Sequence, residues 1–142
     1  MEKSEYRLCE NQLKAEDFIR LKVATGFRDR PIDQVERALQ NDLFDIVAIH
    51  NEEVIGMGRL VGDGVMYWYL QEIIVLPEYQ GKGVGKKIIE TLEQDEYFLR
   101  AKRVEIPASI TACEFYKKMG YTYKNGIDVV DEEQLFRLEK YR

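Results

Sequence analysis

A long apolar stretch, a proline and a glycine-rich turn follow one another over residues 65–86, and this order constrains the fold more than any other feature. Val65 to Leu76 is the longest apolar stretch, and its aromatic and β-branched residues suit a central strand buried on both faces. Pro77 ends that strand because proline cannot donate to a sheet ladder. Apolar residues return at helical spacing from Val84 onwards, so the segment predicts a strand, a turn and a helix.

Patterns on both sides of this segment predict one continuous domain over residues 1–142. Alternating apolar residues indicate strands, and apolar residues three or four positions apart indicate helices. The expected strands also lie at residues 5–10, 44–49, 54–60, 104–106, 121–123 and 135–138, and the expected helices at residues 15–25, 31–39, 84–92 and 111–119. The short connection from His50 to Glu53 predicts an antiparallel hairpin. This order favours an α/β (α+β) fold, a mixed sheet with helices on both faces.

The composition limits the partners of the chain. With 142 residues, 45% of them hydrophobic, the chain can build one substantial core. Its net charge of −5 argues against a dedicated surface for nucleic acid or for anionic membranes. No apolar run approaches the ~20 residues that span a bilayer, and no signal peptide is evident, so we expect a cytoplasmic protein. Cys9, Cys113 and the single His50 cannot form a structural zinc site, and we expect no metal.

The glycine-rich turn has the properties of an anion site. Gly81, Gly83 and Gly85 stand where a helix begins, although a glycine costs about 1 kcal/mol relative to alanine inside a helix. Missing Cβ atoms let a ligand touch the backbone, and the free N–H groups and the helix dipole attract an anion. Cations in a first turn oppose the dipole unless an anion is present, and three occur here, namely Lys82, Lys86 and Lys87. A turn that is merely tight explains the glycines alone equally well.

Two common phosphate motifs do not fit this turn. A dinucleotide fingerprint requires its third glycine at position 86, which is Lys86, and a P-loop requires four residues between its glycines. The pattern that fits is Gln/Arg-x-x-Gly-x-Gly/Ala, with Gln80, Gly83 and Gly85. Together with the preceding strand and proline, it resembles the acetyl-CoA signature of the GNAT superfamily of N-acetyltransferases. The resemblance implies a GNAT-like fold with a mostly antiparallel central sheet, and acetyl-CoA as the acetyl donor.

The resemblance also implies which residues contact the cofactor. Backbone groups of Ile73, Ile74 and Val75 are expected to contact the acetyl-pantetheine part of acetyl-CoA. The pyrophosphate is expected to bind backbone N–H groups of the loop, with the motif residues Gln80, Gly81, Lys82, Gly83, Val84, Gly85 and Lys86 forming the site.

A second matching segment runs from Ser109 to Tyr121. It is similar to the family's helix Asn-x-x-Ala-x-x-x-Tyr-x-x-x-Gly-Phe, and Ser109 stands in place of the asparagine as a cofactor contact. Tyr116 matches the tyrosine whose hydroxyl points at the CoA sulfur, so the resemblance implies a catalytic acid that also contacts the cofactor. A tyrosine that only packs beside Phe115 is the alternative interpretation.

Glu72 interrupts the apolar strand just before the motif and is the best candidate for a general base, acting directly or through water. Acetyl transfer requires a neutral amine, whereas a lysine-like amine with a pKa of about 10.4 is mostly protonated at neutral pH. Some group must therefore take a proton. A carboxylate buried in a strand is expected to be neutralised, paired or functional. A salt bridge to a lysine explains Glu72 as well as catalysis does.

These residues favour an N-acetyltransferase that moves an acetyl group to a primary amine by direct attack in a ternary complex. The acceptor is a small-molecule amine or a peptide, and the motifs do not specify it further. A non-catalytic acetyl-CoA-binding regulatory module is the alternative function, and a protein that binds another phosphate-bearing ligand is a third. The resemblance makes a homodimer a candidate assembly, with the C-terminal strand or an edge of the sheet available for pairing.

Overall fold

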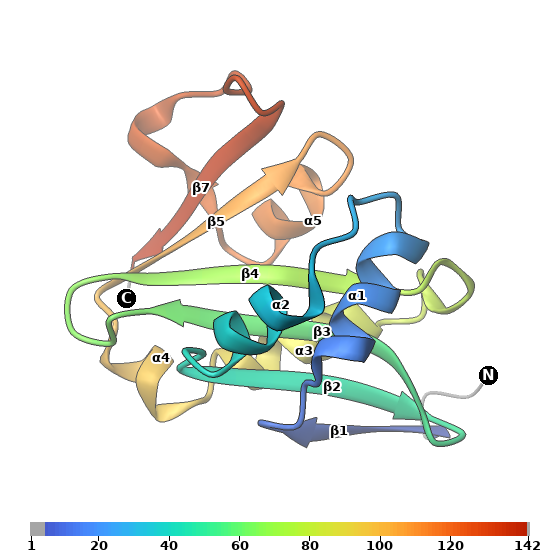
Figure 1. The fold of residues 1–142 in the computed structure, drawn as a ribbon. Coiled ribbons are helices and arrows are strands. Elements are labelled where there is room, and N and C mark those ends of the chain that lie inside the picture. The colour runs from blue at the N-terminus through green and yellow to red at the C-terminus, as the bar shows by residue number, and fades with distance from the viewer. Residues whose placement is uncertain (1–4, 142) are drawn as a thin grey trace.

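A computed structural model describes residues 5–141 as one sheet with helices against both of its faces (Figure 1). The strands are β1 (Tyr6–Glu10), β2 (Phe44–His50), β3 (Glu53–Gly62), β4 (Trp68–Val75), β5 (Arg103–Ser109), β6 (Thr122–Tyr123) and β7 (Leu135–Tyr141). The helices are α1 (Ala15–Ala24), α2 (Ile32–Leu39), α3 (Val84–Leu92), α4 (Glu96–Arg100) and α5 (Cys113–Lys118), and two 3₁₀ turns are η2 (Pro77–Tyr79) and η3 (Lys124–Gly126).

The seven strands follow the order β1-β2-β3-β4-β5-β7-β6 across the sheet. Every neighbouring pair is antiparallel except β4 and β5, which run parallel. The expected hairpin is present, with His50 of β2 opposite Glu53 of β3. The predicted mixed, mostly antiparallel sheet with helices on both faces is therefore confirmed.

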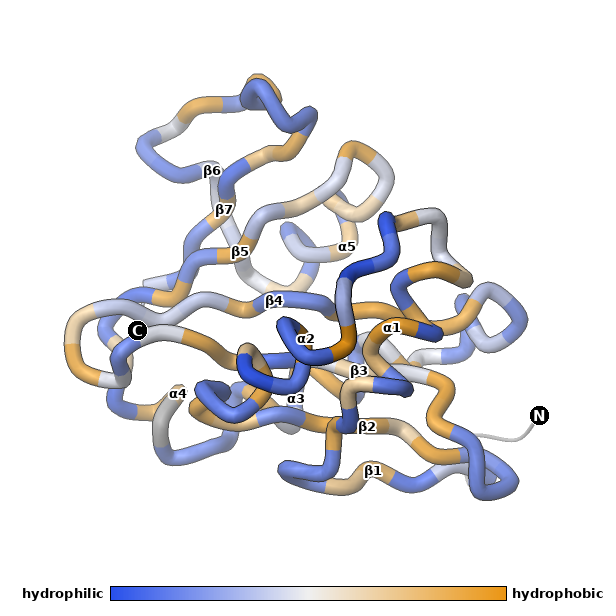
Figure 2. Tube along the Cα trace, in the orientation of Figure 1, coloured by the Kyte–Doolittle hydropathy of each residue, from blue (hydrophilic) through white to orange (hydrophobic). Residues whose placement is uncertain are grey.

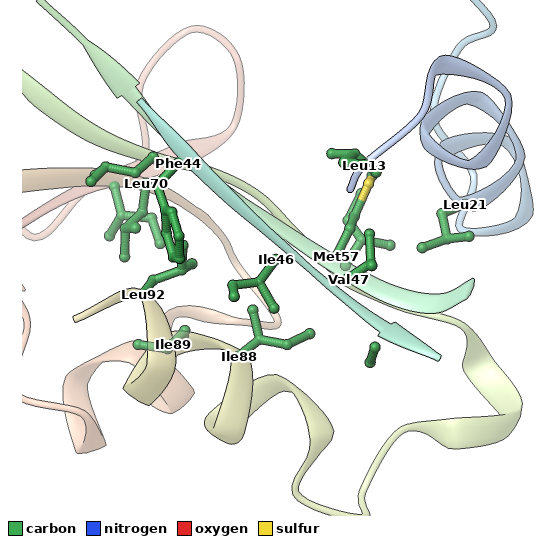
Figure 3. Close-up of a cluster of buried hydrophobic side chains, with 14 of the residues drawn as sticks. Leu13, Leu21, Phe44, Ile46, Val47, Met57, Leu70, Ile88, Ile89 and Leu92 are labelled. Carbon is green, nitrogen blue, oxygen red and sulfur yellow. The ribbon is translucent and has the colours of Figure 1, made fainter. Parts of the chain in front are cut away.

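The core lies on both sides of β2 and β3 because successive side chains of a strand point to opposite faces. On one side, Ile46 of β2 faces Ile88 of α3 (Figure 3). On the other side, Val47 and Met57 face Leu21 of α1 (Figure 3). Hydrophilic residues gather in the connections instead, as in the turn between β2 and β3 (Figure 2). The helices thus pack against both faces of the sheet and hold its strands in place.

The central strand begins later than the apolar stretch predicts. β4 starts at Trp68, and Val65 is 76% exposed in the turn that precedes it. The reason is Asp63, whose side chain binds three residues that the sequence assigned to the strand. Its Oδ1 accepts hydrogen bonds from the backbone N–H groups of Val65, Met66 and Tyr67, at 2.8, 2.8 and 3.0 Å. These donors are bonded inside the turn and cannot join the ladder of β3. The expected burial on both faces is also wrong, since Glu72 and its neighbours in β4 are only partly buried.

The second half of β4 separates from β5. The parallel pair has one register point, Tyr69 opposite Glu105. On the other side of β4, the register with β3 shifts between Met57 and Arg59, opposite Glu72. Glu72 has a φ of 56°, a left-handed conformation that is uncommon for a residue other than glycine. The bulge bends β4 beyond its single register point with β5, and the sheet opens between the two strands there.

Candidate active site

A cleft of about 590 Å³ lies where β4 and β5 part. Its walls come from the second half of β4, the end of β5, the start of α5, the connection between α1 and α2, and the segment before β7. The cleft brings together seven residues that the sequence singled out, namely Glu72, Ile73, Ile74, Val75, Gln80, Ser109 and Tyr116. Residues far apart in the sequence therefore converge on one cavity in the middle of the sheet.

The end of β4 offers backbone groups to this cleft. The N–H of Leu76 donates to the carbonyl of Ile55 at 2.8 Å, so the backbone of Leu76 faces β3. Because backbone directions alternate along a strand, Val75 and Ile73 direct their N–H and C=O groups away from β3, toward the cleft. The backbone of Ile74, opposite Met57, faces β3. Ile73 and Val75 are thus better placed than Ile74 for the expected backbone contacts.

The glycine-rich loop lies at one end of the cleft. Gly81 and Gly83 adopt left-handed conformations with φ of 75° and 85°, and Gly83 directly precedes α3. A Cβ added at Gly81 would meet nothing within 4 Å, which leaves that side of the loop open. A Cβ added at Gly85 would lie 3.7 Å from Val75 and 3.8 Å from Phe115, so the start of α3 adjoins both β4 and α5. Beyond Gln80, the loop adjoins the cleft rather than lining it.

The first turn of α3 keeps its backbone donors available. No side chain caps the helix, and the first turn contains no acidic residue. The first N–H groups of an α-helix have no partner inside the helix, and in α3 they include those of Val84, Gly85 and Lys86. The side chain of Val84 is buried, so only its backbone can contact a ligand. This helix end has the donors and the dipole orientation that an anion requires.

Tyr116 projects from α5 into the cleft from a nearly buried position. Its ring packs edge-on against Phe115 and Tyr121, with centroid distances of 5.3 and 6.3 Å. Burial raises the pKa of the Tyr116 hydroxyl, which therefore stays protonated and available as a donor. Tyr116 therefore packs against its aromatic neighbours and also lines the cleft. Ser109 lines the same wall, where its Oγ accepts the backbone N–H of Ala112 at 3.2 Å.

Glu72 lies in the cleft and also forms a salt bridge, which are the two alternatives that the sequence left open. Its carboxylate lines the cleft, and Oε2 lies 2.8 Å from Nζ of Lys22. Oε1 lies 3.8 Å from Nη1 of Arg59, which in turn binds the buried Asp42 through Nη2 at 2.6 Å. The expected salt bridge to a lysine is thus present. The unusual backbone conformation of Glu72 within a cleft is the kind of strain that accumulates at functional sites.

Comparison with known proteins decides the family. Residues 43–123 match the family model described as an acetyltransferase (GNAT) domain. The chain belongs to the GNAT acetyltransferase family. It is 33% identical over 123 residues to the uncharacterized N-acetyltransferase YjcF of Bacillus subtilis, with 86% of each chain covered. This GNAT chain is accordingly an N-acetyltransferase, as the sequence predicted.

Solved structures share the fold of this GNAT domain. A GNAT family acetyltransferase of Streptococcus pneumoniae is 28% identical, with a TM-score of 0.74 over 89% of this chain and 94% of that chain. An aminoglycoside 6'-N-acetyltransferase complexed with coenzyme A gives a TM-score of 0.73 at 16% identity, with 89% of both chains covered. The second likeness concerns the fold alone.

Sequence reasoning missed the residues on the other side of the GNAT cleft. The connection between α1 and α2 contributes Thr25, Phe27 and Arg30, and Lys22 reaches in from the last turn of α1. Glu133 comes from the segment before β7, and Leu135 is the first residue of β7. An aromatic residue followed by two arginines after Gly26 was the available signal, but nothing in the sequence places that connection beside β4.

Residues 5–141 contain no group of three or more histidine, cysteine, aspartate or glutamate side chains that could hold a metal ion. No helix among those residues is long and apolar enough to cross a membrane.

Proposed function

We propose that the protein transfers the acetyl group of acetyl-CoA to a primary amine of a small molecule or a peptide, by direct attack in a ternary complex. The observation that carries this proposal is the cleft between the diverging strands β4 and β5, with Tyr116 and Glu72 inside it and the glycine-rich loop at its end. An extended thioester fits such a cleft because a strand edge can bond its amide groups and a helix end can bind its phosphates.

Backbone groups form most of the donor half of the site, which is the half that binds acetyl-CoA. The outward groups of Ile73 and Val75 bind the pantetheine amides in the manner of an added strand. The pyrophosphate accepts hydrogen bonds from backbone N–H groups of the loop and of the first turn of α3. Lys82 and Lys86 add positive charge beside that turn. Gln80 shapes the loop, because its side-chain amide donates to the Val75 carbonyl.

The reacting half contains a proton acceptor and a proton donor. Glu72 takes a proton from the acceptor ammonium, directly or through water, and the neutral amine attacks the thioester carbonyl carbon. The C–S bond then breaks, and the electron pair leaves on sulfur. The amide nitrogen gives its second proton to the departing thiolate, so the products are the acetylated amine, the CoA thiol and the proton held by Glu72. Because its pKa is raised, Tyr116 serves this step by donating a hydrogen bond to the thiolate rather than by full ionisation. A thiol with a pKa of about 8.5 is an adequate leaving group with that help.

Two measurements test the proposed function. The first compares the melting temperature of the protein with acetyl-CoA, ATP and NAD, since a ligand that binds the native state stabilises it. We expect acetyl-CoA to stabilise the protein selectively, and stabilisation by ATP or NAD alone would contradict the proposal.

The second measurement follows release of the CoA thiol with a panel of amines that includes arylalkylamines, polyamines, amino sugars, amino acids and peptides. Selective binding of acetyl-CoA without turnover of any amine would favour the regulatory module instead.

A further inference from the structure

Lys22 brings a primary amine of the protein itself into the cleft, on the side formed by Thr25, Phe27 and Arg30, which we call the acceptor side. Its side chain is 13% exposed, and Nζ lies 2.8 Å from Oε2 of Glu72. The same nitrogen lies 4.3 Å from the ring centroid of Phe27 and 5.8 Å from that of Phe18. A carboxylate and aromatic faces are the surroundings that bind an alkylammonium group. The cleft therefore already holds an alkylamine at the residue expected to act as the base.

We propose that Lys22 is an internal acetyl acceptor, which the protein acetylates on its own chain when acetyl-CoA is bound and no external amine competes. The inference rests on the proposed function, because it needs the same donor in the same cleft. Lys22 is the one lysine of residues 5–141 that lines this cleft. A side chain anchored on α1 meets the thioester as an intramolecular reactant, which favours reaction over an amine from solution.

The step balances with the groups present. The Lys22 ammonium gives one proton to Glu72, and Nζ attacks the carbonyl carbon of the acetyl thioester. The new C–N bond forms as the C–S bond breaks, and the electron pair leaves with sulfur. The second proton of the attacking nitrogen passes to the thiolate, so the products are acetyl-lysine, free CoA thiol and one proton that Glu72 returns to water.

The surroundings of Lys22 separate this reaction from chemical acetylation. Acetyl-CoA in solution modifies accessible neutral amines, and Lys22 is mostly buried and ion-paired. Lys102 and Lys118 are exposed on the surface and are the matched positions for chemical modification. Acetylation of Lys22 removes its charge and therefore the ion pair with Glu72. It also leaves a neutral amide in the acceptor side of the cleft, so an external amine substrate and Lys22 compete for one place.

Peptide mass mapping of the full chain incubated with acetyl-CoA and no amine tests the inference. We expect Lys22 to acquire acetyl groups at least about tenfold faster than Lys102 or Lys118, since an oriented intramolecular amine gains a high effective concentration. The rate constant should not change on dilution of the protein. Lys22→Arg keeps the positive charge beside Glu72 and should abolish the modification at position 22. Tyr116→Phe should slow acetylation of Lys22 and leave that of Lys102 and Lys118 unchanged.

Each contrary result points to a different failure. If acetyl-CoA raises the melting temperature and the amine panel shows turnover, but Lys22 stays unmodified while Lys102 and Lys118 react, the internal acceptor is refuted and the proposed function stands. If the rate constant at Lys22 rises with protein concentration, transfer occurs between molecules and the inference is equally refuted. If acetyl-CoA does not change the melting temperature, the proposed function fails and the inference fails with it.

Discussion

The side-chain amide of Gln80 donates a hydrogen bond to the backbone carbonyl of Val75 across 2.8 Å. The bond spans η2 and ties the first residue of the glycine-rich motif to the end of β4. Gln80→Ala removes this bond, whose net value is about 0.5–1.5 kcal/mol, so the Kd for acetyl-CoA should rise roughly 2- to 13-fold. Calorimetric titration with acetyl-CoA measures the change. Gln94→Ala, at an exposed position after α3, should bind as the wild type does, and an unchanged Kd for Gln80→Ala would show that the loop is held by other contacts.

Two glycines with matched backbones separate strain from ligand contact. Gly81 and Gly126 have φ of 75° and 71°, and a Cβ added at either would meet nothing within 4 Å. Alanine in this left-handed region costs about 1–2 kcal/mol, so both substitutions should lower the free energy of unfolding similarly. Only Gly81→Ala should also weaken acetyl-CoA binding, because its Cβ occupies the open side of the loop. Urea unfolding and calorimetric titration of both variants give the comparison. Equal loss of affinity in Gly126→Ala would mean that strain, not contact, is responsible.

Tyr116→Phe removes a hydroxyl and keeps the ring that packs against Phe115 and Tyr121. A hydrogen bond to a charged group contributes about 1.5–3 kcal/mol, so kcat should fall roughly 10- to 160-fold while the Kd for acetyl-CoA changes little. Steady-state kinetics and titration together provide the test. Tyr123→Phe is the matched control, since its hydroxyl contacts Lys117 outside the cleft. A normal kcat in Tyr116→Phe would leave this residue with a packing role only.

Glu72→Gln replaces the proposed base by a neutral amide of nearly the same shape. Loss of a general base costs about 100-fold or more, so kcat/KM should fall by that factor at neutral pH. Steady-state kinetics of the wild type, of Glu72→Gln and of the exposed Glu96→Gln at neutral pH supply the measurement, and Glu96→Gln should match the wild type. An unaltered kcat/KM in Glu72→Gln would reduce Glu72 to the partner of Lys22.

Local signals explain which parts of the molecule could be predicted. The strand, proline, glycine turn and helix from β4 to α3 are each encoded within a few residues, and their order was predicted correctly. The start of β4 was not, because the Asp63 side chain captures the backbone donors of Val65 and its neighbours. α4 was missed because a five-residue helix is too short to show a period.

The acceptor side of the cleft depends on contacts that no local pattern encodes. Lys22 and Glu72 are separated by 50 positions, and their pairing exists only because α1 packs across β3 and β4. The bulge at Glu72 was equally hidden, since glutamate is not a residue that favours a left-handed backbone. The cofactor motif is encoded within a few consecutive residues and could be predicted, whereas the proposed acceptor side of the cleft is formed only by tertiary packing.

A buried acid near the cleft makes stability depend on pH. Burial raises the pKa of Asp42 from 3.8 to about 7, although hydrogen bonding to Arg59 lowers it in part. The folded protein thus binds this proton more tightly than the unfolded chain does. The stabilisation from Asp42 is therefore fully present below pH 3.8 and is lost as the pH rises to about 7.

Asp42→Asn removes this titration and keeps an oxygen that can accept from Nε of Arg59, which now donates at 2.8 Å. The free energy of unfolding of the wild type should decline relative to that of the variant between pH 3.8 and about 7. One proton limits the difference in slope to about 1.4 kcal/mol per pH unit. Urea unfolding across this pH range measures both slopes, with the exposed Asp128→Asn expected to follow the wild type. Parallel curves for the wild type and Asp42→Asn would mean that Arg59 keeps Asp42 ionised throughout, so that the ion pair outweighs the cost of burial.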